Sequence, residues 1–256
     1  MTRPYSYEAP GDFRTPFPQD SQVQNIRAYK RQADEVLAVS AALTDEQKMM
    51  AELFDNKFAS VLASVAFTVQ QKKLSLDDSV HLEFLTNMAS FDTAIAVWNE
   101  KHRYDAVRPF SAIRFLYGNR PVTAWGGPGK GTVNDIPANE WRSYLNVGNH
   151  PEYPSGSASF CSAHAQVIRR FFNSDDLGFS LSVAKGSSKV EPGVTPASDI
   201  VLTWSTWTEF EENCGLSRLW GGVHFIPSIP AGHDLGRTIG AVAYEFVRNH
   251  IDGDVH

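Results

Sequence analysis

Apolar residues recur at helical spacing along most of the chain, and few segments alternate with a period of two. Mixed apolar and charged residues predict a helix over 27–39. Thr44 and Gln47 then form the pattern of a helix-capping box. The apolar residues that follow keep one helical series: Met50, Leu53, Phe54, Phe58, Val61, Leu62 and Val65.

A second capping pattern, Ser75 with Asp78, predicts a helix that runs to about Lys101. Its inward face is predicted to be a row of large apolar residues: Val80, Phe84, Leu85, Met88, Phe91, Ile95 and Trp98. The composition of 158–172 is also helical. The C-terminal third contains three more helical segments, at about 200–214, 217–224 and 231–250.

Two long stretches, 118–151 and 173–198, show no helical period, and the first is rich in Gly, Pro and Asn. Connections of that length are uncommon unless they are functional or mobile. Prolines at positions 4, 10, 16 and 18 predict an irregular arm over about 1–20. We therefore predict an all-α fold: one helical domain over 1–256, built as a helical bundle with long irregular loops.

The charge distribution argues against an extended polyanion partner. The 256 residues carry a formal net charge of −6 and no long run of Lys or Arg, so nucleic acid is not expected to bind. The longest apolar stretch is too short for a membrane span, and the N-terminus lacks the apolar region of a signal peptide. We predict a soluble protein and leave its compartment open, together with the choice between a monomer and a homo-oligomer.

Only two cysteines, Cys161 and Cys214, occur in the chain. This number excludes a scaffold held together mainly by disulfides and leaves the redox compartment undecided. We interpret the two residues as small buried thiols.

The stretch "HPEYPSGSASF", residues 150–160, places small residues at the start of a predicted helix. The first helical turn has free backbone N–H groups, and the helix dipole favours negative charge there. Pro154 restrains the approach, Gly156 lets a ligand come close to the backbone, and Ser155 and Ser157 add hydroxyl donors. The stretch therefore indicates an anion site, with an ordinary helix N-cap as the alternative.

Two further stretches supply positive charge. In "KHRYDAVRP", Lys101 and Arg108 lie on either side of a predicted helix end, where both can reach one point. In "SRLWGGVH", Arg218 and His224 are six residues apart, which on a regular helix is a rotation of about 240°. They meet only if the helix breaks at the Gly-Gly pair between them. A surface pair of cations and a packed core histidine explain each stretch singly, whereas all three stretches together indicate one oxyanion pocket.

These residues resemble a known three-part signature: Lys101 with Arg108-Pro109, then Pro154-Ser155-Gly156, then Ser217-Arg218 with His224. Vanadium-dependent haloperoxidases and type 2 phosphatidic acid phosphatases share it. From about Leu43 onward the chain resembles the C-terminal catalytic half of longer haloperoxidases, including "LTDEQ" and "LSRLWGGVHF". The resemblance implies a helical bundle of the vanadium haloperoxidase and acid phosphatase type.

The resemblance also implies roles for these residues. Lys101, Arg108, Ser155, Gly156 and Arg218 would bind vanadate, or phosphate in the same site, and His224 would be the metal ligand. The implied catalytic residues are Lys101, Ser157 and His224. The implied reaction oxidises halide with hydrogen peroxide to a hypohalous-acid-type species that halogenates a small organic acceptor. The alternatives are a phosphatase with His224 as the nucleophile and a non-catalytic oxyanion-binding relative.

Two positions differ from the usual family pattern. Ser157 stands where the family usually has a histidine that serves as acid–base partner, although some bacterial haloperoxidases and non-halogenating relatives also carry serine. A serine hydroxyl cannot become a cation near neutral pH, which weakens the phosphatase interpretation more than the haloperoxidase one. Ser228 stands where many members have an aspartate that orients the histidine. The residue that orients His224 therefore stays open at this point.

Overall fold

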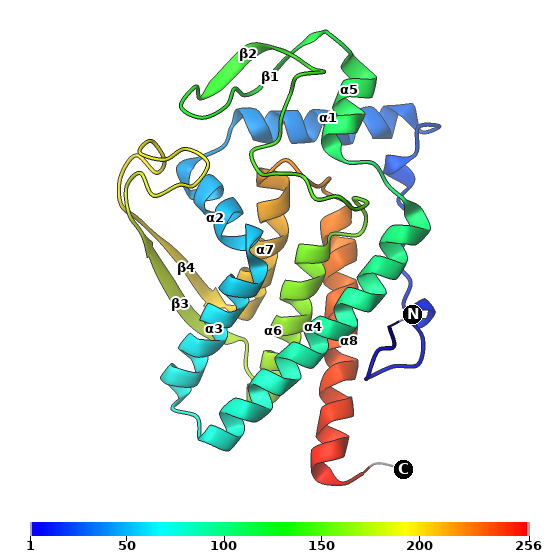
Figure 1. Ribbon diagram of the computed structural model, residues 1–256, viewed down its shortest axis with the longest axis vertical. Coiled ribbons are helices and arrows are strands. Elements are labelled where there is room, and N and C mark those ends of the chain that lie inside the picture. The colour runs from blue at the N-terminus through cyan, green and yellow to red at the C-terminus, as the bar shows by residue number, and fades with distance from the viewer. Residues whose placement is uncertain (1, 255–256) are drawn as a thin grey trace.

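The computed structural model describes residues 2–254 and shows a mainly helical molecule (Figure 1). Within that range the chain forms eight α-helices, which are α1 Ile26–Ala41, α2 Asp45–Asp55, α3 Lys57–Lys72, α4 Leu76–Tyr104, α5 Pro109–Tyr117, α6 Gly156–Phe172, α7 Trp207–Trp220 and α8 Ser228–Asp252. The predicted helical bundle is confirmed.

Helix α6 lies at the centre of the bundle and packs against α4, α7 and α8 (Figure 1). Nearly every residue of α6 from Gly156 to Ile168 is buried. The start of this helix, which carries the predicted anion site, is therefore surrounded by other helices and held in a fixed place.

A stripe of glycines lets α8 approach α6 closely, at Gly232, Gly236 and Gly240. A Cβ atom on Gly236 would lie only 2.1 Å from the carbonyl oxygen of Ser159 in α6. Real Cβ atoms essentially never come that close, so these positions need glycine for packing.

The predicted helix caps are confirmed, but one predicted helix is two. The Thr44 side chain accepts from the backbone N–H of Gln47 at 3.2 Å, and that of Ser75 accepts from the N–H of Asp78 at 3.1 Å. The apolar series after Thr44 is interrupted at Asn56, whose side chain caps α3 by accepting from the N–H of Ala59. This break separates α2 from α3.

The predicted inward face of α4 is wrong for most of its members. Val80 and Phe84 are each 54% exposed, and Phe91 and Trp98 are also exposed, whereas Leu85 is buried as predicted. The apolar residues that α4 buries completely are mostly smaller: Leu82, Leu85, Ala89, Ala96 and Val97. Because α4 lies directly against α6 and α8, small side chains fit the contact and the large aromatic ones lie on its flanks.

Each predicted irregular stretch contributes to a two-stranded antiparallel sheet. Strands β1 (Pro121–Trp125) and β2 (Thr132–Pro137) pair in the first, and β3 (Asp176–Val183) pairs with β4 (Ile200–Thr206) around the second. The predicted helix over 200–214 was therefore wrong in its first half: residues 200–206 form β4, and a capping box at Thr206 starts α7. Two small sheets thus accompany the helices.

The predicted N-terminal arm contains only two short 3-10 turns, Pro10–Asp12 and Gln19–Ser21, in its described part. Two fully buried carboxylates of α4 hold it. Asp92 accepts from the backbone N–H of Tyr5 at 2.9 Å, and Glu100 accepts from the N–H of Thr15 at 2.9 Å. Among the described residues, none of the helices is both long enough and apolar enough to cross a bilayer.

Candidate active site

Two stretches that are far apart in the sequence, 101–108 and 218–224, bring the predicted basic residues together. Lys101 comes from the last turn of α4, Arg108 from the N-cap of α5, Arg218 from the last turn of α7 and His224 from the loop before α8. Each is less than 8% exposed. They converge at the start of α6, where a Cβ on Gly156 would lie 3.7 Å from Cε of Lys101.

The start of α6 forms the N-cap that was the alternative to an anion site, and this cap does not use all of its N–H donors. Ser155 is the N-cap, and its hydroxyl oxygen accepts from the backbone N–H of Ala158 at 3.4 Å. Its own N–H donates to the carbonyl of Ser228 at 2.9 Å, which ties the cap to α8. The next residues, Gly156 and Ser157, are buried in the first turn, where backbone N–H groups have no partner within the helix. An ordinary cap therefore still leaves N–H donors for an anion.

A break after α7 brings Arg218 and His224 together. The helix ends at Trp220, and Gly222 adopts a φ of 71°, which favours glycine. The backbone N–H groups of Val223 and His224 then turn back to the carbonyl of Arg218, at 3.0 and 3.3 Å. The predicted break at the Gly-Gly pair is confirmed.

The hydrogen bonds of His224 define which ring nitrogen carries the proton. Nε2 lies 3.0 Å from Nη1 of Arg108, which can only donate, so Nε2 accepts with its lone pair. Nδ1 lies 2.8 Å from Oε1 of Glu152 and 3.1 Å from Oγ of Ser228. Burial, and then the positive charges of Arg108, Lys101 and Arg218, lower the pKa of His224 well below its usual value. The ring is therefore neutral, and its Nε2 lone pair faces the cations.

Backbone carbonyls hold the cations in position. Nζ of Lys101 donates to the carbonyls of Pro151 and Glu152 at 2.8 and 2.9 Å. Arg108 donates to the carbonyls of His150 and Val223 at 3.1 and 2.7 Å. Burial lowers the pKa of Lys101 to about 7, with the charge of Arg108 as the second cause, and burial likewise lowers the pKa of Arg108 to about 10.

Arg218 is only partly satisfied by its neighbours. Its Nη1 lies 3.2 Å from Oδ1 of Asp55 at the end of α2, while its buried Nε has no hydrogen-bond partner among the described residues. Lys57, at the start of α3, adds another cation nearby: burial and then the charge of Arg218 lower its pKa. Asp55 and Lys57 were not predicted as site residues, because the apolar pattern predicted an unbroken helix where α2 ends and α3 begins.

The donor set suits an oxyanion better than a metal cation. The site contains more cations than carboxylates. Its four cations are Lys57, Lys101, Arg108 and Arg218, and the two carboxylates in contact with it are those of Asp55 and Glu152. No group of three His, Cys, Asp or Glu residues able to hold a cation occurs within 2–254. Excess positive charge, N–H donors and an unpartnered guanidinium nitrogen are what a multiply charged oxyanion needs.

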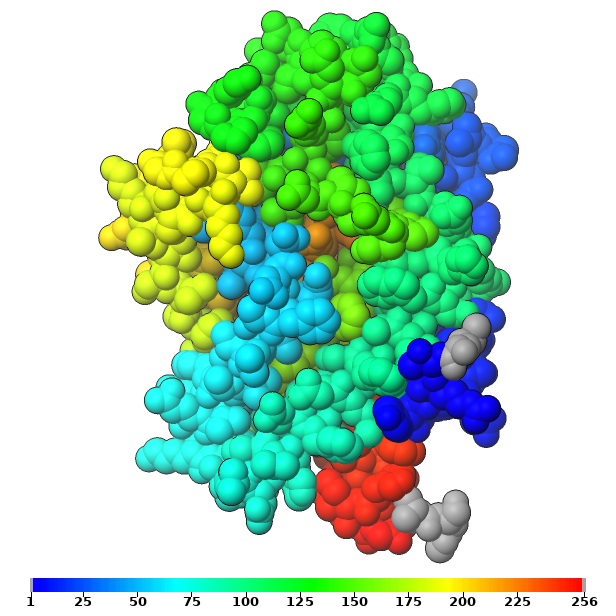
Figure 2. Space-filling model, in the orientation of Figure 1, coloured from blue at the N-terminus to red at the C-terminus, as the bar shows by residue number. Residues whose placement is uncertain are grey.

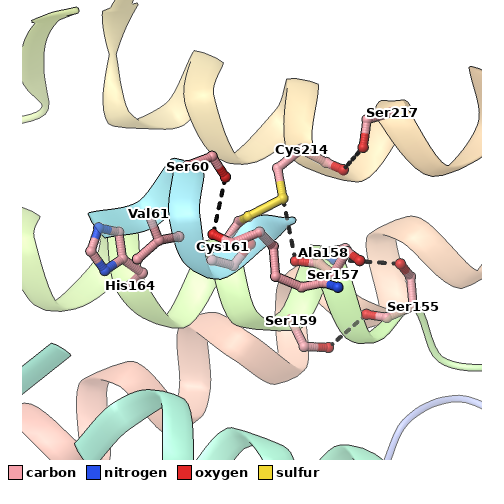
Figure 3. Close-up of a disulfide and its surroundings, with 12 residues drawn as sticks. Ser60, Val61, Ser155, Ser157, Ala158, Ser159, Cys161, His164, Cys214 and Ser217 are labelled. Carbon is pink, nitrogen blue, oxygen red and sulfur yellow. Dashed lines mark hydrogen bonds between the residues drawn. A yellow bond between two sulfur atoms is a disulfide. The ribbon is translucent and has the colours of Figure 1, made fainter. Parts of the chain in front are cut away.

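The two cysteines form a disulfide next to Ser157 at the start of α6, so their interpretation as free thiols was wrong (Figure 3). Cys161 lies one turn beyond Ser157 in α6, and Cys214 lies one turn before Arg218 in α7. Their Cα atoms are 6.4 Å apart, within the range that a disulfide spans, because the two helices pack side by side. Sγ of Cys214 also lies 3.4 Å from the carbonyl oxygen of Ser157.

Figure 2 shows a hollow between the α2–α3 region, in cyan, and the green segment that precedes α6, with orange atoms of the C-terminal third at its floor. A cavity of about 850 Å³ lies beside α2 and the β1–β2 hairpin. Asp55, the partner of Arg218, is among its lining residues, together with Asn56, Trp125 and Leu145. The candidate site thus lies next to a large open cavity.

Residues 81–253 match the family model described as the VCPO second helical-bundle domain. The chain belongs to this family. Vanadium chloroperoxidase from Curvularia inaequalis, one of the chain's relatives, is 26% identical over 188 residues, which cover 62% of this chain and 29% of that protein.

Solved structures agree with the assignment to the VCPO second helical-bundle domain. The holo-type bacterial vanadium-dependent chloroperoxidase is 45% identical with a TM-score of 0.95, over 98% of this chain and 54% of that chain. The apo-type bacterial vanadium-dependent chloroperoxidase is also 45% identical, with a TM-score of 0.97, over 99% of this chain and 56% of that chain. A bacterial vanadium-dependent iodoperoxidase, at 19% identity and a TM-score of 0.63 over 85% of this chain and 49% of that chain, shares the fold. The chain spans about half the length of the bacterial chloroperoxidases that it matches.

Proposed function

We propose that this protein is a vanadate-dependent haloperoxidase, which oxidises halide with hydrogen peroxide to a hypohalous-acid-type species that halogenates a small organic acceptor. The observation that carries the proposal is the meeting of three buried cations with the Nε2 lone pair of a neutral His224. The likeness to bacterial vanadium-dependent chloroperoxidases supports the choice of vanadate over other oxyanions.

In this proposal Lys101, Arg108 and Arg218 balance the charge of the bound oxyanion. The Ser155 hydroxyl and the Gly156 N–H add hydrogen bonds at the start of α6. His224 supplies Nε2 as the one protein ligand to the metal. Bound vanadate would supply a Lewis acid that activates hydrogen peroxide toward halide.

Proton handling is proposed to lie with Lys101 rather than Ser157. The Ser157 hydroxyl can donate or accept a hydrogen bond but stays neutral near pH 7. Burial lowers the pKa of Lys101 to about 7 in the anion-free site, and a bound anion would raise it again, so Nζ would hold its proton beside the bound oxyanion near neutral pH. The neutrality of Ser157 also weakens a phosphatase, because the family's usual acid for the leaving group is the histidine that Ser157 replaces.

The test combines oxyanion binding with two activities. Purified protein is titrated with vanadate and then given hydrogen peroxide, bromide or iodide, and a phenolic acceptor, while p-nitrophenyl phosphate turnover is measured without vanadate. His224→Ala removes the proposed ligand, and His102→Ala is the control, because His102 is exposed on α4 beside Lys101.

Halogenation that His224→Ala abolishes and His102→Ala retains is the expected result. Phosphate release that depends on His224 in place of halogenation would favour the phosphatase. Oxyanion binding without either turnover would leave a non-catalytic oxyanion-binding relative.

A further inference from the structure

Glu152 is a fully buried carboxylate two residues before Pro154, and the sequence analysis assigned it no role. Its Oε1 lies 2.8 Å from Nδ1 of His224 and accepts from the backbone N–H of Phe225 at 3.0 Å. One carboxylate oxygen therefore binds the imidazole ring and the backbone of the next residue. This double contact restrains both the ring orientation and the loop that carries it.

The two neighbours of the ring require the same tautomer. Oε1 of Glu152 already accepts from the backbone N–H of Phe225, which identifies it as an acceptor, so Nδ1 must carry the proton that it donates to this oxygen. Arg108 only donates, so Nε2 must present its lone pair. Ser228 is the more distant acceptor of the Nδ1 proton, at 3.1 Å, and it acts as an acceptor because its own hydroxyl proton is donated to the carbonyl of Phe225 at 3.0 Å.

The segment that carries Glu152 also holds the cations. The carbonyls of Pro151 and Glu152 accept from Lys101, and the carbonyl of His150 accepts from Arg108. Residues 150–152 thus set the positions of three groups of the site relative to one another. The carboxylate is the part of this segment that acts on His224.

We propose that Glu152 is the positioning residue of His224: it fixes the ring and keeps the proton on Nδ1, so that Nε2 presents its lone pair to the metal. The inference rests on the proposed vanadate function. It also explains Ser228, since the carboxylate that many family members carry four residues after the histidine is supplied here from 72 residues earlier in the chain. Partners of this kind typically change metal affinity by about 10- to 100-fold.

The test compares vanadate with phosphate in wild-type protein and three variants. Removing the Glu152 charge changes the attraction of the site for both anions, so the ratio of the two dissociation constants reports on the bond to Nε2 alone. Nitrogen-15 NMR of His224 in vanadate-free protein reports the tautomer directly. Glu211→Gln is the control, because Glu211 is an equally buried carboxylate that pairs with Arg169 and Arg237.

In Glu152→Gln the amide oxygen still accepts from Nδ1, so the tautomer should persist and the ratio should stay within about threefold of wild type. Glu152→Met removes the acceptor, and the vanadate affinity should fall about 10- to 100-fold relative to the phosphate affinity, with a mixed tautomer. Should the Met variant fail to fold, Glu152→Asp keeps the charge but withdraws it from Nδ1, and the ratio should shift in the same direction. The Glu211→Gln control should leave the ratio unchanged.

Equal losses of vanadate and phosphate affinity in Glu152→Met, or an unchanged tautomer, would overturn the inference and leave Glu152 as a structural counterion. Failure of the wild-type protein to bind vanadate would instead overturn the proposed function. The NMR result in vanadate-free protein would still decide whether Glu152 sets the tautomer.

Discussion

Two glycines of α8 offer a matched test of how the bundle supports the site. A Cβ on Gly232 would lie 2.5 Å from the carbonyl oxygen of Ser155, and a Cβ on Gly240 would lie 2.5 Å from that of Ala163. The two clashes have the same length and involve the same kind of atom. Gly232 faces the N-cap of α6 at the proposed anion site, whereas Gly240 faces α6 two turns further on.

The expected magnitudes follow from these distances. Ordinary Cβ contacts begin at 3.4 Å, so alanine at either position must push α8 and α6 apart by roughly 1 Å. Overpacking of this kind costs about 1–3 kcal/mol, and the better helix propensity of alanine offsets up to about 1 kcal/mol. Each variant should therefore lose about 1–2 kcal/mol of unfolding free energy, which lowers Tm by roughly 2–8 °C.

Oxyanion affinity should distinguish the two variants. Gly232→Ala displaces Ser155 and Gly156, and we expect its vanadate affinity to fall about tenfold or more, since a misplacement near 1 Å can cost about 100-fold at a reacting site. Gly240→Ala should change the affinity less than about twofold. Thermal unfolding and calorimetric titration measure the two effects. Equal losses of affinity, or no loss of Tm in either variant, would refute the reasoning.

Three further predictions concern single side chains. Arg218→Ala should lower vanadate affinity about 10- to 100-fold and Ser157→Ala clearly less, because a charge-assisted hydrogen bond contributes about 1.5–3 kcal/mol; equal losses in equilibrium titrations would contradict the assigned roles. Sulfate does not titrate near neutral pH, and its affinity should fall by up to about tenfold per pH unit as the pH rises above about 7. The reason is that a bound anion raises the pKa of Lys101, so the anion-free site loses the Lys101 proton first. Lys101→Met should flatten this pH dependence of sulfate affinity. Burial lowers the pKa of His164 to about 3, so on acidification the His164 ring of the unfolded chain is protonated before that of the folded protein. The unfolding free energy should therefore fall by about 1.4 kcal/mol per pH unit as the pH drops from about 6.5 toward 3. Denaturant titrations at several pH values should show that the unfolding free energy depends less steeply on pH in His164→Leu than in the wild type. The control His81→Gln, at an exposed position, should keep the wild-type pH dependence.

The features that the sequence determined by itself depend on residues three or four positions apart. The caps at Thr44 and Ser75, and the helical start behind Pro154, are local hydrogen-bond patterns that the chain forms wherever it lies. The basic residues of the site were also identifiable, because their types and spacing match a known signature. Their convergence was a prediction that the geometry confirms for Arg108 and His224, at 3.0 Å.

The buried face of α4 and the strand β4 depend instead on the neighbouring elements that pack against them. The helical period of α4 shows which side chains share a face, but only the positions of α6 and α8 decide that Leu82 is buried and Phe84 exposed. Similarly, residues 200–206 alternate weakly enough to be mistaken for a helix, and they become a strand because β3 is there to pair with them.

The contacts that complete the site were decided by tertiary structure alone. Glu152 and His224 are 72 residues apart, and the cysteines of the disulfide are separated by 53. Whether such pairs meet depends on the packing of all the helices and turns between them, and no local preference of the chain encodes that distance. The residue types at the candidate site are therefore readable from the sequence, whereas the carboxylate that contacts His224 appears only once the bundle is assembled.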